Sequence, residues 1–422
     1  MLKIKKNILK MALLGFCASN IVQAGEVEVL HYWTSGGEAK SVAELKRLLQ
    51  EKGHQWKDFS VAGGGGDAAL TVLKSRAVSG NPPTAAQVKG PSIQEWGDQG
   101  VLADISETAK QGDWDNLLPE VVANVMKYKG KYVATPVNVH RVNWMWANPA
   151  AFEKAGVTVP QNWDDFFVAA DKLKAAGIIP IAHGGQPWQD FTVFESIVLG
   201  VGGADLYKKV FVSLDTDAMT SPSMVKSFEI FKRLKEYMDP GFPGRDWNVA
   251  TGMVIEGKAA MQFMGDWAKG EFTAANKIPG KDFLCLPAPG SNGSFTFNID
   301  SFILFKQDDK SSTEAQNALA KTIMEPKFQE VFNLNKGSIP ARLNMPRDNF
   351  DACATSSMDQ FVSSAAVGEL VPSVAHGMAA FDSVKGAMQD VVTNYFNSKN
   401  ISADKAAQDF SKQVAAAKLE LF

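Results

Sequence analysis

The sequence predicts an α/β protein of two lobes, each built on a parallel β-sheet with helices on both faces. Strand-then-helix units recur along the chain, and strands that are joined through helices pair in parallel. The chain has 422 residues, whereas a single hydrophobic core usually stops growing at about 250–300 residues. A hydrophobic content of 45% is sufficient for two cores.

The first strand-then-helix units lie near the N-terminus. Residues 26–33 alternate and are β-prone, and an amphipathic helix follows over 35–49. A second unit of strand, glycine-containing turn and helix covers 60–80, and the short apolar segment 84–88 is a third strand. Ligands of open α/β sheets bind beyond the carboxyl ends of the strands, so the residues after each strand are the first candidates for a site.

Later segments keep the same alternation. The pattern predicts strands over 131–136 and 178–182, a helix over 168–176, and long helical stretches over 224–237, 313–333 and 403–419. No segment is low in complexity, and the chain has no internal repeat.

The N-terminal residues 1–24 read as a secretory signal peptide. Lysines precede an apolar run that ends at the small-residue site Val22-Gln23-Ala24, so cleavage is expected after Ala24. The run is shorter than the roughly 20 apolar residues that a transmembrane helix needs. Cys17 offers a lipoprotein alternative, but Phe16 stands where a lipid-attachment site has a small residue.

Charge and cysteine content narrow the partners and cofactors. The formal net charge is −3 and becomes more negative without the lysine-rich signal, which argues against nucleic acid as a partner. Cys285 and Cys353 remain after processing, and in an oxidising compartment such a pair is expected to form a disulfide. No zinc-ligand spacing occurs, so neither a metal nor another cofactor is expected.

Aromatic and charged residues follow the first strand. Tyr32 and Trp33 supply flat faces that suit the C–H face of a pyranose, and the carboxylate of Glu38 can accept hydrogen bonds from its hydroxyl groups. The structural alternative makes Trp33 a core residue and Glu38 a helix-start residue that complements the helix dipole.

The glycine-rich segment 63–66 formally fits a dinucleotide-binding motif with Ala68. The acidic residue expected about 20 residues further on is missing, so the glycines are interpreted as a tight turn that brings the next helix to the cleft. Lys89 ends the third strand, where an ammonium group can donate to sugar oxygens, although an ordinary surface lysine is the alternative.

Further candidates lie between Trp188 and His376. Trp267 directly follows a strand and a glycine, a position that favours an exposed stacking platform over the core, and Trp188 is a weaker candidate of the same kind. Asp300, Lys336 and His376 each lie beside a glycine or a strand end. Each of these three alone is more often structural than functional.

Several segments together resemble the solute-binding proteins of sugar ABC importers, and more closely the glucose-binding periplasmic members of that family. The general cues are 256–261, 265–267 and 130–136, and the glucose-type cues are 31–38, 62–67, 87–90, 136–141, 183–188 and 265–270. The likeness runs from about Glu26 to the C-terminus. The family often has tryptophan where Tyr32 stands, so the identity of the ligand is less certain than the function.

The resemblance implies two α/β lobes that are joined by three crossings near 135–138, 298–302 and 337–342. It implies an N-terminal lobe of 25–136 and 299–338 and a C-terminal lobe of 137–298 and 339–422, with a ligand cleft between them. One lobe would supply Tyr32, Trp33, Glu38, Lys89, Asp300 and Lys336, and the other Trp267 and His376.

The resemblance further implies a periplasmic, monomeric protein that binds a monosaccharide, with glucose as the first candidate and mannose and galactose as alternatives. It would deliver the sugar to the permease subunits of an ABC transporter in the inner membrane and would not be an enzyme. The alternative is a secreted glycoside hydrolase in which Glu38 and Asp300 act as the paired carboxylates.

Overall fold

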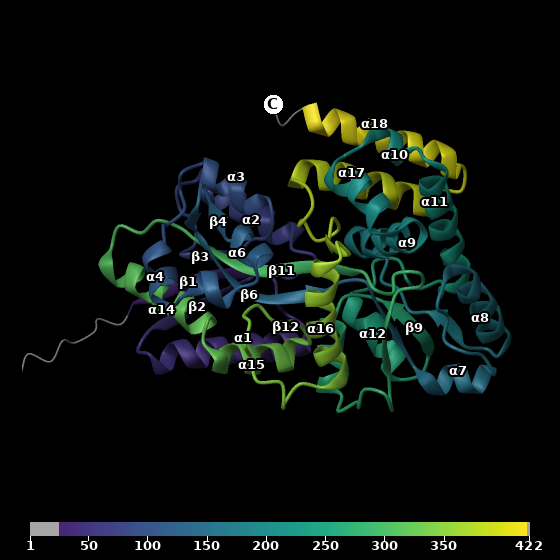
Figure 1. Cartoon of the computed structure of the whole chain (residues 1–422), viewed down its shortest axis with the longest axis horizontal. Helices are drawn as coiled ribbons and strands as arrows, with labels where there is room; N and C mark the ends of the chain where they lie inside the picture. Colours follow the sequence, from purple (N-terminus) through teal and green to yellow (C-terminus); the bar gives the residue numbers. More distant parts are fainter. Residues whose placement is uncertain (1–24, 420–422) are drawn as a thin grey trace, which may run out of the picture.

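The structure, a computed structural model, describes residues 25–419, so the predicted signal peptide, residues 1–24, lies outside the described residues. Two sheets with their helices form two lobes side by side (Figure 1). This arrangement confirms the predicted α/β fold of two lobes. Between residues 25 and 419, no helix combines the length and the apolar character that crossing a membrane requires.

The large sheet belongs to the first lobe and has the strand order β12-β6-β11-β3-β1-β2, with β13 also paired to β11. Its strands are β1 (Glu26–His31), β2 (Gln55–Ser60), β3 (Ala85–Gln87), β6 (Ala134–Arg141), β11 (Phe295–Leu304), β12 (Ile339–Pro340) and β13 (Leu370–Pro372). The first three are parallel, but β11 runs antiparallel to β3 and β6. The expectation of a parallel sheet is therefore wrong here, because β11 returns from the second lobe and enters the sheet from the opposite direction.

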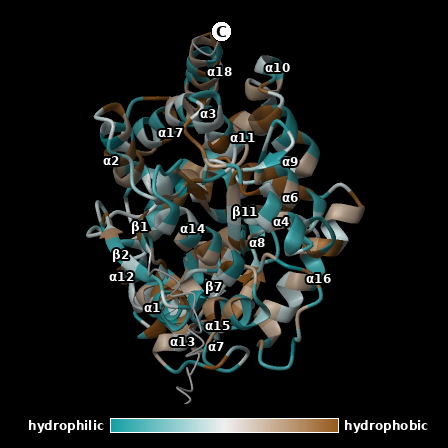
Figure 2. Ribbon diagram, turned by 90° about the vertical axis from the view of Figure 1, so that its left-hand side faces the viewer, coloured by the Kyte–Doolittle hydropathy of each residue, from teal (hydrophilic) through white to brown (hydrophobic). Residues whose placement is uncertain are grey.

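Strands β6 and β11 carry the chain between the lobes. Every residue of both strands is buried, and they pair over most of their length, with a register shift between Asp300 and Ser301. The short strand β12 pairs with β6 on the other side. The three crossing segments therefore lie next to one another across the middle of the molecule (Figure 1), and β11 also lies near the centre of the view in Figure 2. The exact lobe boundaries stay a prediction.

Helices cover the first lobe on both faces (Figure 1). They are α1 (Gly36–Glu51), α2 (Asp67–Val78), α3 (Ser92–Asp98), α4 (Ser106–Gln111), α5 (Trp114–Leu117), α6 (Glu120–Val125), α14 (Lys310–Ile323) and α15 (Pro326–Lys336), beside the hairpin of β4 (Lys127–Tyr128) and β5 (Lys131–Tyr132). The predicted single helix over 313–333 is two helices, because Pro326 starts a new helix and Glu325 before it is extended. The predicted strand over 131–136 is divided at Val133 between β5 and β6.

The second lobe contains a smaller sheet of order β10-β7-β9-β8. Its strands are β7 (Trp144–Ala147), β8 (Ile179–Ile181), β9 (Ala259–Phe263) and β10 (Leu284–Pro287). Its helices are α7 (Pro149–Ala155), α8 (Trp163–Ala175), α9 (Pro187–Tyr207), α10 (Thr216–Met219), α11 (Pro222–Leu234), α12 (Trp247–Ile255), α13 (Ala268–Ala274), α17 (Asp382–Asn397) and α18 (Ala403–Leu419). Short π and 3₁₀ turns cover Lys208–Val212 and Lys235–Tyr237.

Helix α16 (Ala352–Ala366) links the two sheets. It packs against β11, β12 and β13 of the large sheet. Its Cys353 forms a disulfide with Cys285 in β10 of the small sheet, with the two Cα atoms 6.0 Å apart. The predicted disulfide is confirmed.

The lobes also meet through α13, which packs against α1 and α15. The contact is close because Gly270 has no side chain: a Cβ atom there would lie 2.7 Å from the carbonyl oxygen of Asn335. On another side of the interface, Lys385 of α17 pairs with Asp67 of α2 at 2.8 Å. These contacts hold the lobes together around the space between them.

Candidate functional site

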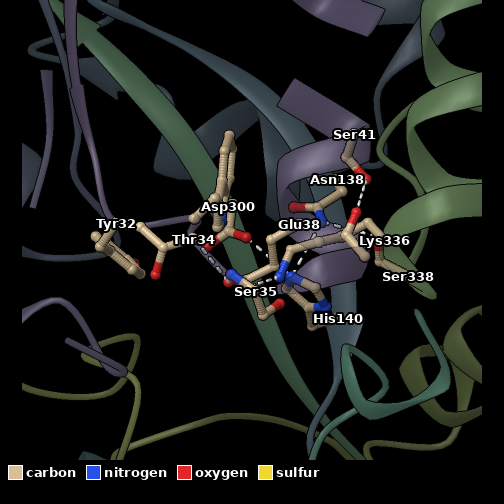
Figure 3. A network of polar contacts seen from close by, with 12 residues as sticks. Tyr32, Thr34, Ser35, Glu38, Ser41, Asn138, His140, Asp300, Lys336 and Ser338 are labelled. Atoms are coloured by element: carbon tan, nitrogen blue, oxygen red, sulfur yellow. Dashed lines mark hydrogen bonds and ion pairs between the residues drawn. The ribbon is translucent and has the colours of Figure 1, made fainter. Parts of the chain in front are cut away.

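A cavity of about 400 Å³ lies between the lobes. The structure brings all eight predicted site residues to its wall: Tyr32, Trp33, Glu38, Lys89, Trp267, Asp300, Lys336 and His376. Most of them come from segments that follow a strand or begin a helix, and they are spread over more than 300 positions of the sequence. Tyr32, Glu38, Asp300 and Lys336 are labelled in Figure 3 together with polar neighbours.

Glu38 and Lys336 form an ion pair on the cavity wall. Lys336 is the last residue of α15, and its ammonium donates to Oε1 of Glu38 at 2.7 Å. The other oxygen, Oε2, accepts from the backbone N–H groups of Thr34 and Ser35, at 3.1 and 3.2 Å, at the start of α1. Glu38 is thus both a helix-start residue, as in the structural interpretation, and a cavity residue. Its fixed orientation leaves its carboxylate and the Lys336 ammonium at the cavity.

The sequence predicted that Asp300 follows a strand. Instead it lies within β11, because the strand continues to Leu304. A register shift lies beside it, and its side chain lines the cavity, where Oδ1 accepts from the Gln87 amide at 3.3 Å and Lys89 Nζ lies 4.0 Å away. Burial alone would raise the pKa of Asp300, but contact with His140 and the charges of Lys89 and Lys336 hold it below its usual range. Asp300 is therefore a permanently ionised acceptor at neutral pH.

Lys89 is the second buried cation. Burial lowers its pKa to about 8, although the carboxylate of Asp300 acts in the opposite direction. The ammonium also lies 5.5 Å from the ring centre of Tyr32. Burial, followed by the charges of Asp300 and Glu38, raises the pKa of Tyr32 well above its usual value, so its phenol stays neutral and can donate.

Trp267 closes the opposite side of the cavity. Its ring meets the edges of His140 and His376 at centre distances of 5.2 and 4.8 Å, and Trp188 lies 6.4 Å away. The expectation that Trp267 would be exposed is wrong: only 7% of its surface is accessible, because it packs in a hydrophobic cluster that includes Trp188 and borders the cavity. Its position at the cavity nevertheless agrees with a platform for stacking.

His376 lies beside Trp267 on the same wall. Its Nε2 is 3.0 Å from the hydroxyl of Thr192. Burial, followed by the charges of Lys89 and His140, lowers its pKa well below the usual value, so the ring is neutral. Neutral imidazole can both accept and donate a hydrogen bond, which suits recognition of a hydroxyl group.

Trp33 belongs mainly to the first core. It is 2% exposed, and its ring packs against Phe302 and Phe332 at 5.5 and 5.3 Å. Only part of it reaches the cavity. Its surroundings are therefore compatible with Trp33 as a core residue and also with Trp33 as a stacking residue of the site.

The glycine loop at 63–66 also borders the cavity. A Cβ atom on Gly64 would lie 2.6 Å from the indole of Trp188, and one on Gly66 would lie 2.7 Å from the ring of Tyr32. Gly63, Gly65 and Gly66 have positive φ angles, which glycine adopts without strain. The glycines therefore let the loop approach two aromatic rings, as the interpretation of a tight turn at the cleft requires.

Comparison with known proteins decides the family. The family of bacterial extracellular solute-binding proteins matches residues 36–321. The chain is 46% identical to a "Probable sugar-binding periplasmic protein" of Brucella melitensis, over 97% of this chain and 99% of that one, and equally similar to one of Rhizobium meliloti over 97% and 98%. The protein belongs to the bacterial extracellular solute-binding protein family.

Solved structures agree with this membership at the level of the fold. The solute-binding protein superposes on a chitin oligosaccharide binding protein with a TM-score of 0.79 at 19% identity, covering 94% of this chain and 99% of that one. It superposes on the solute receptor AcbH, which prefers β-D-galactopyranose, with a TM-score of 0.78 at 18% identity, covering 94% and 100%. More distantly, it is 27% identical to the glucose-binding protein GlcS of Saccharolobus solfataricus over 57% of this chain and 45% of that one.

Membership in a family of binding proteins sets aside the alternative of a glycoside hydrolase. The cavity gives the same answer on physical grounds. A general acid needs a carboxyl group whose pKa is raised, whereas the pKa of Asp300 is lowered by His140 and two lysines, and Glu38 is paired with Lys336. The solute-binding protein is not an enzyme.

Sequence reasoning missed several residues that line the cavity of the solute-binding protein. They are His140, Asn298, Asp246, Trp247 and Asn248. One signal was available for the first of them: within the fully buried strand β6, polar residues recur at Asn138 and His140. A polar side chain in a buried strand needs a partner or a ligand. The residues near the start of α12 carry no comparable signal.

Proposed function

We propose that this solute-binding protein binds a glucose-type monosaccharide in the cavity between its lobes. The observation that carries the proposal is the composition of that cavity, which combines aromatic rings with two lysines and three carboxylates in about 400 Å³. Aromatic faces suit the C–H face of a pyranose, and ionised groups suit its hydroxyl groups. The relatives in Brucella melitensis and Rhizobium meliloti are named as sugar-binding periplasmic proteins.

Buried polar atoms without partners support a ligand rich in hydroxyl groups. Among the described residues, Oδ1 of Asn298 and the hydroxyls of Tyr32 and Ser35 are buried and have no hydrogen-bond partner, and all three residues line the cavity. An unsatisfied buried polar group costs about 1–3 kcal/mol. A sugar that hydrogen-bonds to these atoms would remove that cost.

The size of the cavity favours a monosaccharide. Small-molecule sites span about 300–1,000 Å³, and this cavity lies near the lower limit. The distant relative GlcS is named for glucose. Glucose is therefore the first candidate, and mannose and galactose are the alternatives.

Binding would proceed by closure of the lobes. The sugar first docks on the charged groups of the first lobe, Glu38, Lys89, Asp300 and Lys336, and rotation about the crossing strands then brings Trp267 and His376 over it. Hydrogen bonds to charged groups contribute about 1.5–3 kcal/mol each. Four such groups plus stacking are sufficient for micromolar affinity, about −8 kcal/mol, after the costs of ordering.

The same proposal places the protein in the periplasm as a monomer that delivers its sugar to the permease subunits of an ABC transporter. The predicted signal peptide, the disulfide and the names of the relatives support an extracytoplasmic location. Membership in the solute-binding protein family supports the release of an unaltered sugar to a membrane partner.

Titration of ligand-stripped protein tests the proposal. Glucose, mannose, galactose and xylose are titrated by calorimetry and tryptophan fluorescence, with maltose as the larger competitor and glucitol as a control that keeps the hydroxyl groups but lacks the pyranose ring. We expect micromolar binding of one hexose and no binding of glucitol. Tighter binding of maltose than of every monosaccharide, or no binding of any aldose, would contradict the proposal.

A further inference from the structure

His140 lies between two carboxylates from distant parts of the chain. Its Nε2 is 2.8 Å from Oδ2 of Asp300, and its Nδ1 contacts Oδ1 of Asp266. The ring is 1% exposed. The side-chain amide nitrogen of Asn138 lies 3.0 Å from Nε2 and donates to Oγ of Ser338 at 2.8 Å.

A histidine ring can donate to two carboxylates at once only as an imidazolium. Burial alone would lower the pKa of His140, but the charges of Asp266 and Asp300 and the contacts with them raise it overall. The cations Lys89 and Lys336 act on the charge of Asp300. The double contact and the electrostatic balance therefore both favour the charged ring.

The two carboxylates belong to different parts of the candidate site. Asp300 is the acceptor on the cavity wall. Asp266 directly precedes Trp267, and its Oδ2 accepts from the backbone N–H of Arg141 at 2.9 Å, which ties the Trp267 segment to β6. The ring of Trp267 also rests against the edge of the His140 ring, 5.2 Å away.

We propose that His140 is a positioning residue for sugar recognition, because its imidazolium fixes the acceptor Asp300 and the platform Trp267 in one arrangement. Without it, Asp300 would be free to turn toward Lys89, and the segment of Trp267 would lose one of its anchors. The inference rests on the proposed sugar-binding function. In this arrangement the hydrogen-bonding acceptor and the stacking platform both depend on the buried charge of His140.

The test compares His140→Gln with His183→Gln by calorimetry with the preferred hexose. His183 is a matched control because it is also buried, contacts a single carboxylate, Asp190, at 2.8 Å, and does not line the cavity. We expect His140→Gln to weaken binding at least roughly tenfold, a loss of about 1.4 kcal/mol, and His183→Gln to change affinity less than threefold. If both variants lose affinity equally, or His140→Gln keeps the affinity of the parent, the positioning role is refuted.

A double-mutant cycle separates positioning from general damage to the fold. If His140 acts through Asp300, His140→Gln adds little to the loss caused by Asp300→Asn, because the acceptor is already weakened. Fully additive losses would show that His140 acts independently of Asp300 and would overturn this part of the proposal. Thermal melts of all variants confirm that each is folded.

A spectroscopic measurement on the unliganded parent protein gives a readout that needs neither sugar nor a stable His140 variant. With ¹⁵N-labelled histidine at about pH 7.5, above the ordinary histidine pKa of about 6.5, we expect one of the five rings to carry protons on both nitrogens. Its signal is assigned by its loss in His140→Gln, or by its survival in single variants of the other four histidines. If no ring is doubly protonated at this pH, the imidazolium bridge is refuted. Failure of every aldose to bind would refute the proposed function instead.

Discussion

Among the residues of the cavity, burial and pairing decide which side chains are charged. Asp300 stays ionised because His140 and two lysines surround it, and His376 stays neutral because it is buried near cations. A donor or acceptor whose charge is set in advance needs no reorganisation when a ligand arrives. Such groups make the stronger class of hydrogen bond.

Lys89 leads to a prediction about proton uptake. Burial lowers its pKa from 10.5 to about 8, so between these values the folded chain binds fewer protons at this site than the unfolded chain, and this residue makes the unliganded protein more stable as the pH rises. A sugar oxygen that accepts from the ammonium favours the charged form. We therefore expect sugar binding near pH 8 to take up protons and to weaken as the pH rises further.

Calorimetry in two buffers of different ionisation enthalpy measures this uptake. Lys89→Met is expected to bind more weakly and to take up fewer protons than the parent. Equal proton uptake in the parent and in Lys89→Met would assign the titration to another group.

Trp267 leads to a prediction about stacking. Trp267→Ala removes the ring that covers the cavity, and we expect at least roughly tenfold weaker binding, about 1.4 kcal/mol. Trp267→Phe is the matched variant, since it keeps an aromatic face and should retain part of the affinity. Calorimetry on both variants, with a thermal melt to confirm folding, checks the effect; an unchanged affinity of Trp267→Ala would rule out the stacking role.

At the scale of helices and strands, close backbone contacts place the cavity residues. Helix α13 carries Trp267 at its start and lies against α1 and α15, which carry Glu38 and Lys336. Glu271 of α13 also accepts from the N–H of Gly37, in the first turn of α1, at 3.1 Å. A carboxylate at the N-terminus of a helix complements its dipole. The two lobes thus share a contact directly beside the cavity.

Gly270 offers a test of this contact. In Gly270→Ala the new Cβ would lie 2.7 Å from the carbonyl oxygen of Asn335 and 3.0 Å from that of Lys336, so α13 must shift. We expect a loss of stability of about 1–3 kcal/mol, as for other overpacked sites, together with weaker sugar binding. Chemical denaturation and calorimetry measure the two effects.

Gly386 of α17 provides the control for this prediction. A Cβ there meets no atom within 4 Å, so Gly386→Ala should be neutral or stabilising by up to about 1 kcal/mol, because alanine favours the helix more than glycine does. If Gly270→Ala behaved like Gly386→Ala, the close contact of α13 would have no energetic importance.

At the scale of the whole molecule, three crossing strands and the disulfide join the lobes on one side, and ion pairs join them elsewhere. Lys385 of α17 and Asp67 of α2 lie 2.8 Å apart, and Lys74 and Asp382 lie 3.6 Å apart. Both pairs connect α2 of the first lobe with the α17 region of the second. They would separate if the lobes moved apart, so they favour the closed arrangement.

Lys385→Met should therefore weaken sugar binding about fivefold, close to 1 kcal/mol, the upper part of the range for partly exposed ion pairs. Lys405→Met is the control, since Lys405 pairs with Asp409 inside the single helix α18. Calorimetry measures the affinities, and small-angle scattering with and without sugar measures how far the lobes separate. Equal affinities of the two variants would show that the Lys385 pair does not contribute to closure.

Much of this architecture could be predicted from local sequence patterns. Strand-then-helix alternation and chain length predict two α/β lobes. The two cysteines outside the predicted signal peptide predict the disulfide of Cys285 with Cys353. Residues after strands, such as Lys89, and residues at the start of a helix, such as Glu38, could be singled out because position relative to a strand or helix is a local property. Lys336 and His376 could be singled out only as polar residues beside a glycine, and the motif resemblance assigned them to the site.

Tertiary structure alone decided how these residues are paired and how far they are buried. Three features differ from the expectation: the direction of β11, the exposure of Trp267 and the place of Asp300 inside a strand. Each depends on contacts with segments that are distant in the sequence. His140 is the clearest case: its carboxylate partners are 126 and 160 residues away in the sequence. Local pattern can show that such a side chain is polar and buried, but its charge is set by neighbours that only the folded chain brings into contact.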